Sequence, residues 1–323
     1  MKVAILNDYQ RAVPTLAAFS KLSGHAIEVF SDAERDEAKI AERLADFEAI
    51  ILIRERTRFT TSLIARLPRL KLLVQTGKVG PHVDLEACRA RGITVCDSGG
   101  SPVAPAELTW ALILMGMRDL ATEIERTRRG LWQGGLGRAV AGRRLGLIGF
   151  GRIAQRVARY AAAFEVPVTV WGRETTVARA REAGLQTAES LSGVCAESDI
   201  VSVHLRLIDA TRGIVKFEHL AAMKPDALFV NTSRAELVEP GALERALKLG
   251  RPGRAAVDVF EDEPVFDPAH PLVALPNVVA TPHIGFVERD TYERYFGDAF
   301  EAVNAFAAGK PVRVVERGRE RSA

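Results

Sequence analysis

Short runs of apolar residues alternate along the chain with segments in which apolar residues recur every three or four positions. In the first hundred residues the runs predict buried strands, at residues 2–6, 26–30, 49–53, 70–74 and 93–96. The periodic segments predict helices, at residues 34–45, 63–67 and 85–90, the last with Asp84 as its N-cap. Such alternation is typical of a parallel sheet that helices cover on both faces. We therefore expect an α/β unit here.

The same alternation resumes after a break. Residues 98–102, Ser-Gly-Gly-Ser-Pro, give the strongest linker signal in the chain. One long helix is predicted over residues 105–128, followed by a glycine-rich loop at residues 130–137. Further apolar runs predict strands, at residues 145–148, 168–171, 200–204, 227–231, 255–259 and 278–280. This succession is typical of a doubly wound nucleotide-binding domain.

The end of the chain predicts one more helix, at residues 287–307, and an edge strand at residues 312–315. A helix and a strand beyond a complete nucleotide domain are expected to return to the first unit. We therefore predict a discontinuous first domain, made of residues 1–100 and 288–323. Residues 101–287 form the inserted second domain.

Composition narrows the possible partners and the compartment. The chain has 323 residues, of which 47% are hydrophobic and 26% charged, and its net charge is only +3. The basic residues are scattered apart from the tail at residues 313–321, which we interpret as a solvated end. We expect neither a nucleic-acid nor a membrane partner, since no apolar run of about 18 residues occurs. The three cysteines lack metal-type spacing, so we predict no metal site and a cytoplasmic location with reduced thiols.

A glycine turn links the strand at residues 145–148 to a helical pattern. Gly149 permits the tight turn, Gly151 lets a pyrophosphate approach the backbone, and the small Ala154 lets helix and strand pack closely. The start of the helix then offers free N–H groups to the phosphates. A glycine pattern alone is weak, but the strand and helix around it favour a dinucleotide site over a plain turn.

The next strand ends without the carboxylate that usually binds the adenosine ribose. Position 172 is glycine, and Arg173 and Glu174 follow it. Arg173 is suited to a 2′-phosphate, which favours NADP over NAD. The alternative is that Arg173 is a solvated loop residue and that Glu174 bonds the ribose.

Three later segments stand at predicted strand ends, where open α/β sheets bind ligands. They contain Arg234, then Asp258 with Glu263, then His283. An arginine offers a forked donor to a carboxylate or carbonyl, and a histidine can give or take a proton when a carboxylate fixes its tautomer. Spacing alone does not bring the three together. Singly, Arg234 could be a surface residue, Glu263 one of several acids in a turn, and His283 a satisfied core histidine.

Taken together, these segments resemble the D-isomer-specific 2-hydroxyacid dehydrogenases over nearly the whole chain. The resemblance rests on four motifs that follow one another in the family's order: Gly149-Phe150-Gly151-Arg152-Ile153, Met223-Lys224-Pro225 leading into Asn231-Thr232-Ser233-Arg234, Asp258-Val259-Phe260 with Glu263-Pro264, and Pro282-His283. It implies two Rossmann-like or flavodoxin-like α/β domains with parallel sheets. The discontinuous domain would be the substrate domain and the inserted one the dinucleotide-binding domain, with the active site in the cleft.

The resemblance also implies a role for individual residues. Arg234 would orient the substrate, His283 would be the acid/base, and Glu263 would be the partner of His283. The loop at residues 75–80 would hold the substrate carboxylate, through Lys78, Val79, Gly80 and Arg54, although Lys78 could equally be a solvated lysine. NAD(P) would bind at Gly149, Phe150, Gly151, Arg152, Ile153, Gly172, Arg173, His204, Arg206, Thr232, Asp258 and Gly285.

Two departures from the family pattern affect these expectations. Ala235 follows Arg234 where the family usually has glycine, so a positive φ there would cost energy and shift Arg234. After His204 the family usually has a proline two residues on, whereas this chain has Leu205 and Arg206. Arg206 is therefore a second candidate for a 2′-phosphate. His204 is expected on the cofactor side or in a structural role, not in catalysis.

We thus predict an oxidoreductase that transfers a hydride between NAD(P)H and a 2-keto acid or D-2-hydroxy acid, and that forms a homodimer. One alternative is a dinucleotide-sensing protein of the same fold that resembles a corepressor. Another keeps the reaction but has a phosphorylated substrate. Its candidate cations are Lys78 and the arginines at 54, 56 and 58, which would share one side if the strand before them continued.

Overall fold

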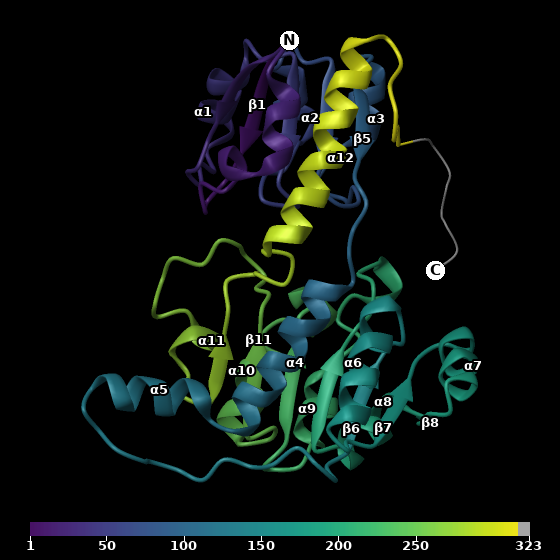
Figure 1. Ribbon diagram of the computed structural model, residues 1–323. Helices are drawn as coiled ribbons and strands as arrows, with labels where there is room; N and C mark the ends of the chain where they lie inside the picture. Colours follow the sequence, from purple (N-terminus) through teal and green to yellow (C-terminus); the bar gives the residue numbers. More distant parts are fainter. Residues whose placement is uncertain (316–323) are drawn as a thin grey trace. The chain divides into compact units, whose positions relative to one another are not determined.

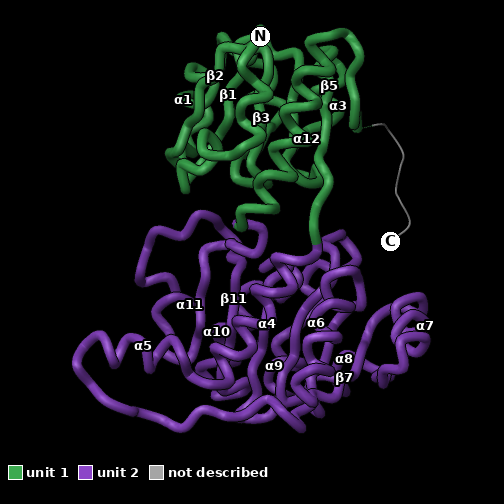
Figure 2. The backbone as a smooth tube through the Cα atoms, viewed as in Figure 1, with its two compact units in different colours: residues 1–101, 288–323 green, residues 102–287 purple. Residues whose placement is uncertain are grey.

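The computed structural model describes residues 1–315, and the chain divides into two compact units. Unit 1 consists of Met1–Ser101 and the segment that starts at Glu288, and unit 2 is Pro102–Val287 (Figures 1 and 2). Within residues 1–315, none of the helices combines the length and apolar character that crossing a membrane requires. Most of the basic tail predicted to be a solvated end lies outside the described residues.

Unit 1 is built on a parallel sheet of five strands in the order β2-β1-β3-β4-β5. The strands are β1 (Lys2–Leu6), β2 (Ala26–Val29), β3 (Ala49–Leu52), β4 (Leu72–Gln75) and β5 (Thr94–Asp97). This order is that of the flavodoxin-like fold. The inner strands β3 and β4 are fully buried, which explains why their sequences are continuous apolar runs instead of alternating ones.

Helices flank this sheet, and polar side chains determine where several of them begin. The elements are η1 (Val13–Thr15), η2 (Ala17–Leu22), α1 (Glu37–Leu44), α2 (Thr61–Ala65), α3 (Leu85–Ala90) and α12 (Arg289–Ala307). Asp36 accepts hydrogen bonds from the N–H groups of Ala38 and Lys39, so α1 begins three residues later than predicted. The predicted N-cap Asp84 is confirmed, because its carboxylate accepts from Glu86 and Ala87.

The last helix returns to unit 1. Phe296 and Phe300 of α12 are buried, and the Phe300 ring lies 6.1 Å from that of Phe19 in η2. After the helix, the predicted edge strand is reduced to one antiparallel bridge between Val314 and Cys96 of β5. The C-terminal segment is therefore part of the first α/β unit.

Unit 2 contains a parallel sheet of seven strands in the order β12-β11-β10-β9-β6-β7-β8. The strands are β6 (Leu145–Ile148), β7 (Val168–Trp171), β8 (Gln186–Thr187), β9 (Ile200–Val203), β10 (Leu228–Asn231), β11 (Arg254–Val257) and β12 (Val278–Ala280). The first strand of the unit lies in the middle and the order reverses beside it, as in a Rossmann fold. The predicted fold class, two α/β units with parallel sheets, is confirmed.

Helices cover both faces of this sheet. The elements are α4 (Val103–Met117), α5 (Leu120–Arg128), α6 (Arg152–Ala163), α7 (Glu174–Glu182), α8 (Leu191–Glu197), η3 (Asp209–Thr211), α9 (Phe217–Ala221), η4 (Ala235–Leu237), α10 (Ala242–Leu249) and α11 (Pro271–Ala274). One apolar cluster joins α4 and α6 to the sheet, and another joins α8, α9 and α10 to it. The carboxyl ends of the strands therefore form an edge free of the covering layers, where such folds bind ligands.

The single helix predicted over residues 105–128 is wrong. The chain forms two helices, α4 and α5, separated at Asp119, which has the left-handed φ of +52°. A residue in that conformation cannot continue the helical hydrogen-bond pattern. The Asp119 carboxylate is 3.0 Å from the Arg254 guanidinium at the start of β11, a long-range contact that apolar periodicity cannot indicate.

The turn between β6 and α6 requires glycine at one of its two glycine positions. At the other, the backbone could accept a larger residue. Gly149 has a φ of +96°, and a Cβ there would lie 2.6 Å from the carbonyl oxygen of His204. Gly151 has a φ of −80°, and a Cβ there would meet no atom within 4 Å. The backbone of the neighbouring strand thus approaches the turn closely only at the first glycine.

We expect Gly149→Ala to lower the free energy of unfolding by about 2 kcal/mol or more, because of its positive φ and the backbone overlap. The matched change Gly151→Ala should alter stability by less than about 1 kcal/mol, since the added methyl has room. Urea denaturation of the two variants beside the wild type measures both. Equal losses of stability would contradict this account of the turn.

Candidate active site

The glycine turn of unit 2 provides the features that a dinucleotide needs. Gly151 is the N-cap of α6 without a side-chain cap, and no acidic residue occupies the first turn of the helix. The open space beside Gly151 is a cradle that any larger side chain would fill. Phe150 is buried, Arg152 is exposed and Ile153 is half-buried, while Ala154 lies in the core as the sequence predicts. The residues present therefore fit the phosphates of a dinucleotide.

The strands on either side of β6 carry exposed arginines after their carboxyl ends. Arg173 follows β7 and Arg206 follows β9, and neither guanidinium has a partner among residues 1–315. At Gly172 a Cβ would lie 2.6 Å from the Thr176 methyl group, so this chain has no ready space for the usual carboxylate side chain. Glu174 is exposed in the first turn of α7. Positive charge, not a carboxylate, thus predominates at this part of the sheet edge.

His204 lies at the same edge and is suited to binding, not to proton transfer. Its Nε2 is 2.9 Å from the Ser202 hydroxyl, whereas its buried Nδ1 has no hydrogen-bond partner in the described part of the chain. Burial lowers the pKa of His204 to about 4, so the ring is neutral at physiological pH. Thr232, after β10, has its hydroxyl 2.7 Å from that of Thr109 in α4.

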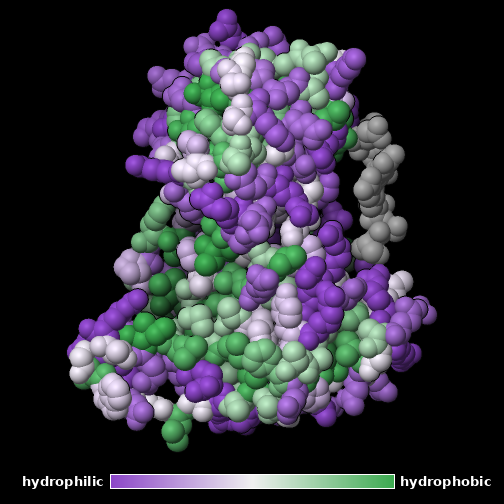
Figure 3. All heavy atoms as spheres, in the orientation of Figure 1, coloured by the Kyte–Doolittle hydropathy of each residue, from purple (hydrophilic) through white to green (hydrophobic). Residues whose placement is uncertain are grey.

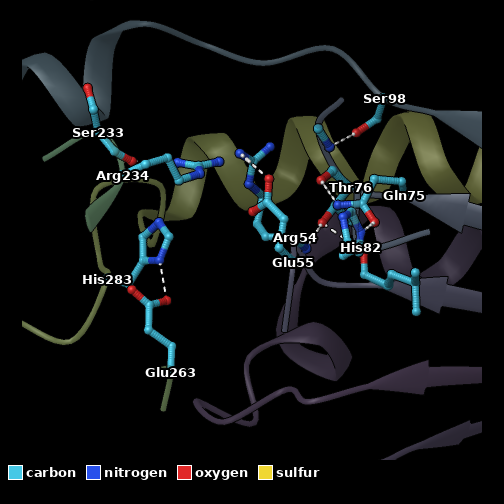
Figure 4. A network of polar contacts seen from close by, with 12 residues as sticks. Arg54, Glu55, Gln75, Thr76, His82, Ser98, Ser233, Arg234, Glu263 and His283 are labelled. Atoms are coloured by element: carbon cyan, nitrogen blue, oxygen red, sulfur yellow. Dashed lines mark hydrogen bonds and ion pairs between the residues drawn. The ribbon is translucent and has the colours of Figure 1, made fainter. Parts of the chain in front are cut away.

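The structure brings Glu263 and His283 together, although 20 residues separate them. Glu263 Oε2 lies 2.6 Å from His283 Nδ1 (Figure 4), and Glu263 Oε1 accepts the N–H of Phe260 at 2.9 Å. The Phe286 ring packs edge-on against the imidazole, with 5.6 Å between ring centroids. This arrangement fixes the orientation of the ring, and because Nδ1 faces the carboxylate, Nε2 is the nitrogen left for a substrate.

A buried carboxylate holds the segment that carries His283. Asp258 accepts hydrogen bonds from the Thr281 hydroxyl at 2.7 Å and from the N–H groups of Ile284 and Gly285, both at 2.8 Å. Burial raises the pKa of Asp258, and these hydrogen bonds act in the opposite direction. Gly285 is buried with its Cβ position 3.2 Å from Asp258 Oδ2. The sequence indicates a cofactor contact for Asp258 but contains no signal for these hydrogen bonds to the His283 segment.

Arg234 stands on a short segment that Asn231 organises. The Asn231 side chain accepts the N–H of Ser233 at 3.0 Å and donates to the carbonyl of Arg234 at 2.9 Å. Arg234 itself is extended and half-buried (Figure 4), and Ala235 begins the η4 turn without a positive φ. Alanine in place of glycine after Arg234 therefore causes no backbone strain, and the concern raised by the sequence does not apply.

In unit 1 the loop after β4 leaves several N–H groups without an acceptor. Gly77 has a φ of +76° and donates its N–H to the Ser98 hydroxyl at 2.7 Å. The N–H groups of Lys78, Val79 and Gly80 donate to no acceptor among residues 1–315, and the next residue, Pro81, has no N–H. Consecutive free N–H groups in a turn form a concavity that suits an anion such as a carboxylate.

Arg54 lies against this loop. Its backbone has the left-handed φ of +55°, and its N–H donates to the Thr76 hydroxyl at 3.0 Å (Figure 4). A Cβ on Gly77 would overlap the Arg54 guanidinium, so the arginine crosses the loop at a glycine. The strand before Arg54 does not continue, because β3 ends at Leu52 and the chain turns, so the condition for arginines 54, 56 and 58 to share one side is not met.

Of the other candidate cations, Arg58 is exposed, whereas Lys78 and Arg56 have partners. Lys78 forms an ion pair with Asp97 at 2.5 Å and its side chain is 68% exposed. Arg56 donates to the carbonyl of Asn7 at 2.7 Å and lies 4.4 Å from the centre of the Tyr9 ring. Glu55 also lies beside the loop, as do His82 and Gln75, whose side chains are 3.0 Å apart. No sequence motif indicates these contacts.

Within the described residues, no group of His, Cys, Asp or Glu side chains is arranged to hold a metal ion. The three cysteines are buried, and burial raises the pKa of each thiol, to about 11 for Cys88 and Cys96 and about 12 for Cys195. These thiols are therefore unreactive packing groups.

Comparison with known proteins identifies the family. Residues 110–285 match the model described as D-isomer specific 2-hydroxyacid dehydrogenase, NAD binding domain. A glyoxylate reductase from Aeropyrum pernix is 38% identical over 271 residues, which are 80% of each chain. A crystal structure of a phosphoglycerate oxidoreductase from Vibrio cholerae O395 has a TM-score of 0.94 and 51% identity, over 96% of this chain and 99% of the other.

Another relative differs in length. A D-3-phosphoglycerate dehydrogenase from Methanocaldococcus jannaschii is 32% identical over 262 residues, which are 80% of this chain but only 49% of that protein. The chain thus spans about half the length of that relative. Since the family model covers more than half of the chain and the glyoxylate reductase aligns over most of it, the chain is an enzyme of the NAD(P)-dependent D-isomer specific 2-hydroxyacid dehydrogenase family.

Proposed function

We propose that this protein interconverts a short 2-keto acid and the corresponding D-2-hydroxy acid. The observation that carries the proposal is the pair of Glu263 and His283, 2.6 Å apart, in the same unit as a glycine turn that fits a dinucleotide. The nicotinamide cofactor, when bound, donates or accepts the hydride. The residues of the chain supply the proton, the orientation of the substrate and the stabilisation of charge.

His283 is the proton donor in reduction and the proton acceptor in oxidation. Glu263 holds Nδ1, so Nε2–H is the group that gives its proton to the carbonyl oxygen. Asp258 and Phe286 keep the ring in place, through the backbone of residues 281–285 and through edge-on packing. In this proposal Asp258 is a positioning residue for His283, besides its expected place near the nicotinamide.

Arg234 and the loop of unit 1 hold the substrate. The guanidinium of Arg234 orients the substrate and stabilises the charge that develops on the carbonyl oxygen. The N–H groups of Lys78, Val79 and Gly80 take the carboxylate, with Arg54 beside them. Unit 1 is accordingly the substrate domain and unit 2 the dinucleotide-binding domain.

We propose that the enzyme prefers NADP to NAD as its cofactor. Two exposed arginines, Arg173 and Arg206, follow the strands on either side of β6, and Thr176 occupies the place into which a side chain at 172 would point. A 2′-phosphate is bound best by guanidinium groups with free donors.

The protein is proposed to act as a homodimer. In Figure 1, α5 and the chain after it reach away from the rest of unit 2, and Figure 3 shows hydrophobic residues gathered beside them. Trp132 is 80% and Leu136 92% exposed, yet Arg126 bonds the Trp132 carbonyl at 3.0 Å and Glu123 bonds the Gly134 N–H at 3.2 Å. An ordered segment that exposes large apolar groups is typical of an interface, here with a second copy.

We expect the wild type to oxidise NADPH or NADH with glyoxylate, hydroxypyruvate or pyruvate, and His283→Gln to lose kcat by about 100-fold or more. Arg234→Ala should lose kcat/KM by about 100-fold, and Arg234→Lys should recover it only in part, because lysine lacks the fork. Steady-state kinetics of the purified full chain test this. Dinucleotide binding by calorimetry without turnover on any 2-keto acid would instead favour the corepressor-like alternative.

Replacing Arg173 by alanine should raise KM for NADPH about tenfold and leave KM for NADH unchanged, since only the 2′-phosphate loses a charged partner. Arg206→Ala should act in the same direction. The control is Arg181→Ala. Arg181 is an exposed arginine in the last turn of α7, the helix that Arg173 precedes. If KM for NADPH is unchanged in both Arg173→Ala and Arg206→Ala, the ribose contact belongs to Glu174 or to another residue.

The double change Trp132→Ser with Leu136→Ser should convert the dimer to a monomer without unfolding it, because both side chains are exposed. Light scattering coupled to gel filtration gives the mass, and the circular dichroism melt checks folding. The control is Leu249→Ser. Leu249 lies on α10 and is 61% exposed. If the wild type is already a monomer in solution, the proposed homodimer is wrong.

A further inference from the structure

We infer that Glu55 determines the substrate class of this enzyme, favouring 2-keto acids with a neutral hydroxyl beside the keto group and excluding those with a second anionic group. The inference rests on the proposed function, because it assumes that the loop at residues 77–80 binds the substrate carboxylate. It names which 2-keto acids fit that loop.

Glu55 borders the loop directly. Its Oε1 lies 3.9 Å from the Cβ position of Gly80 and 3.5 Å from the Arg54 guanidinium, and its side chain is 27% exposed (Figure 4). His82, buried and bonded to Gln75, lines the same position, with Nδ1 3.4 Å away. A small molecule bound to the N–H groups of the loop therefore has a carboxylate and an imidazole as neighbours.

Three of the described cations near the loop already have partners of their own. Arg54 is paired with Glu55, Lys78 with Asp97, and Arg56 donates to a backbone carbonyl and stacks on Tyr9. The N–H groups suffice for one carboxylate. A phosphate or second carboxylate would meet the Glu55 charge at short range in a half-buried site, where repulsion is weakly screened.

A hydroxyl group of the substrate, in contrast, would be attracted to Glu55 as a hydrogen-bond donor. An ionised carboxylate only accepts hydrogen bonds, and a bond from a hydroxyl to a charged acceptor is stronger than one to a neutral acceptor. The Glu55 side chain, held from one side by Arg54, is thus oriented to accept from a substituent on the carbon beside the keto group. Hydroxypyruvate carries such a hydroxyl, pyruvate lacks it, and 3-phosphohydroxypyruvate replaces it by an anion.

The test compares kcat/KM for these three acids in the wild type, Glu55→Ala and Glu55→Gln, with the preferred cofactor and the full chain. Wild type should prefer hydroxypyruvate to 3-phosphohydroxypyruvate. In Glu55→Ala the ratio of hydroxypyruvate to pyruvate should fall about tenfold, the effect of one hydrogen bond to a charged group. In Glu55→Gln, which keeps an acceptor but loses the charge, 3-phosphohydroxypyruvate should gain about tenfold relative to pyruvate.

Ratios within one variant do not depend on the fraction of protein that is folded, so a destabilised variant still gives a result. Glu28→Ala and Glu28→Gln, at an exposed glutamate of β2, are the matched controls and should leave both ratios unchanged. Unchanged ratios in the Glu55 variants, or a wild type that prefers the phosphorylated acid, would overturn the inference while the proposed function stands. If the wild type turned over no 2-keto acid, the proposed function itself would fail.

Discussion

The carboxylate of Asp258 is the constraint on which the geometry of His283, the proposed proton donor, depends. It lies fully buried at the end of β11 and binds three groups of the segment after β12. Burying a carboxylate without hydrogen-bond partners would cost free energy. The burial of Asp258 therefore depends on this segment keeping the conformation that supplies its donors. This segment carries His283, whose Nδ1 lies 2.6 Å from Glu263.

A second close approach, of Gly149 to the backbone of His204, ties the glycine turn to the strand beside it. The same contact places His204 at the edge of the sheet, where its buried Nδ1 lacks a protein partner. The turn, the histidine and the two arginines after β7 and β9 therefore form one edge, made by adjacent parallel strands. The dinucleotide site that we propose at this edge therefore depends on backbone spacing as much as on side chains.

The sequence allowed most of the fold to be predicted, because buried parallel strands are continuous apolar runs and glycine turns have a local signature. It also pointed to Arg234, Glu263 and His283, through motifs that a family shares. It could not reveal that Asp258 binds the His283 segment, that Asp119 ends a helix by pairing with Arg254, or that Glu55 pairs with Arg54 over the loop. Each of these depends on which distant segments meet, and apolar periodicity contains no information about side-chain partners.

Arg54 and His283, to which we assign proposed roles in the two units, share a backbone feature. Each is a non-glycine residue with positive φ, 55° and 51°, soon after a strand ends. Glycine would avoid the cost of this conformation, about 1–3 kcal/mol, but it has no side chain to offer. The surroundings instead enforce the conformation, through Thr76 for Arg54 and through Asp258 for His283. Because the neighbours hold the backbone, a charged or titratable side chain can stand at a tight turn where its direction is fixed before any substrate arrives.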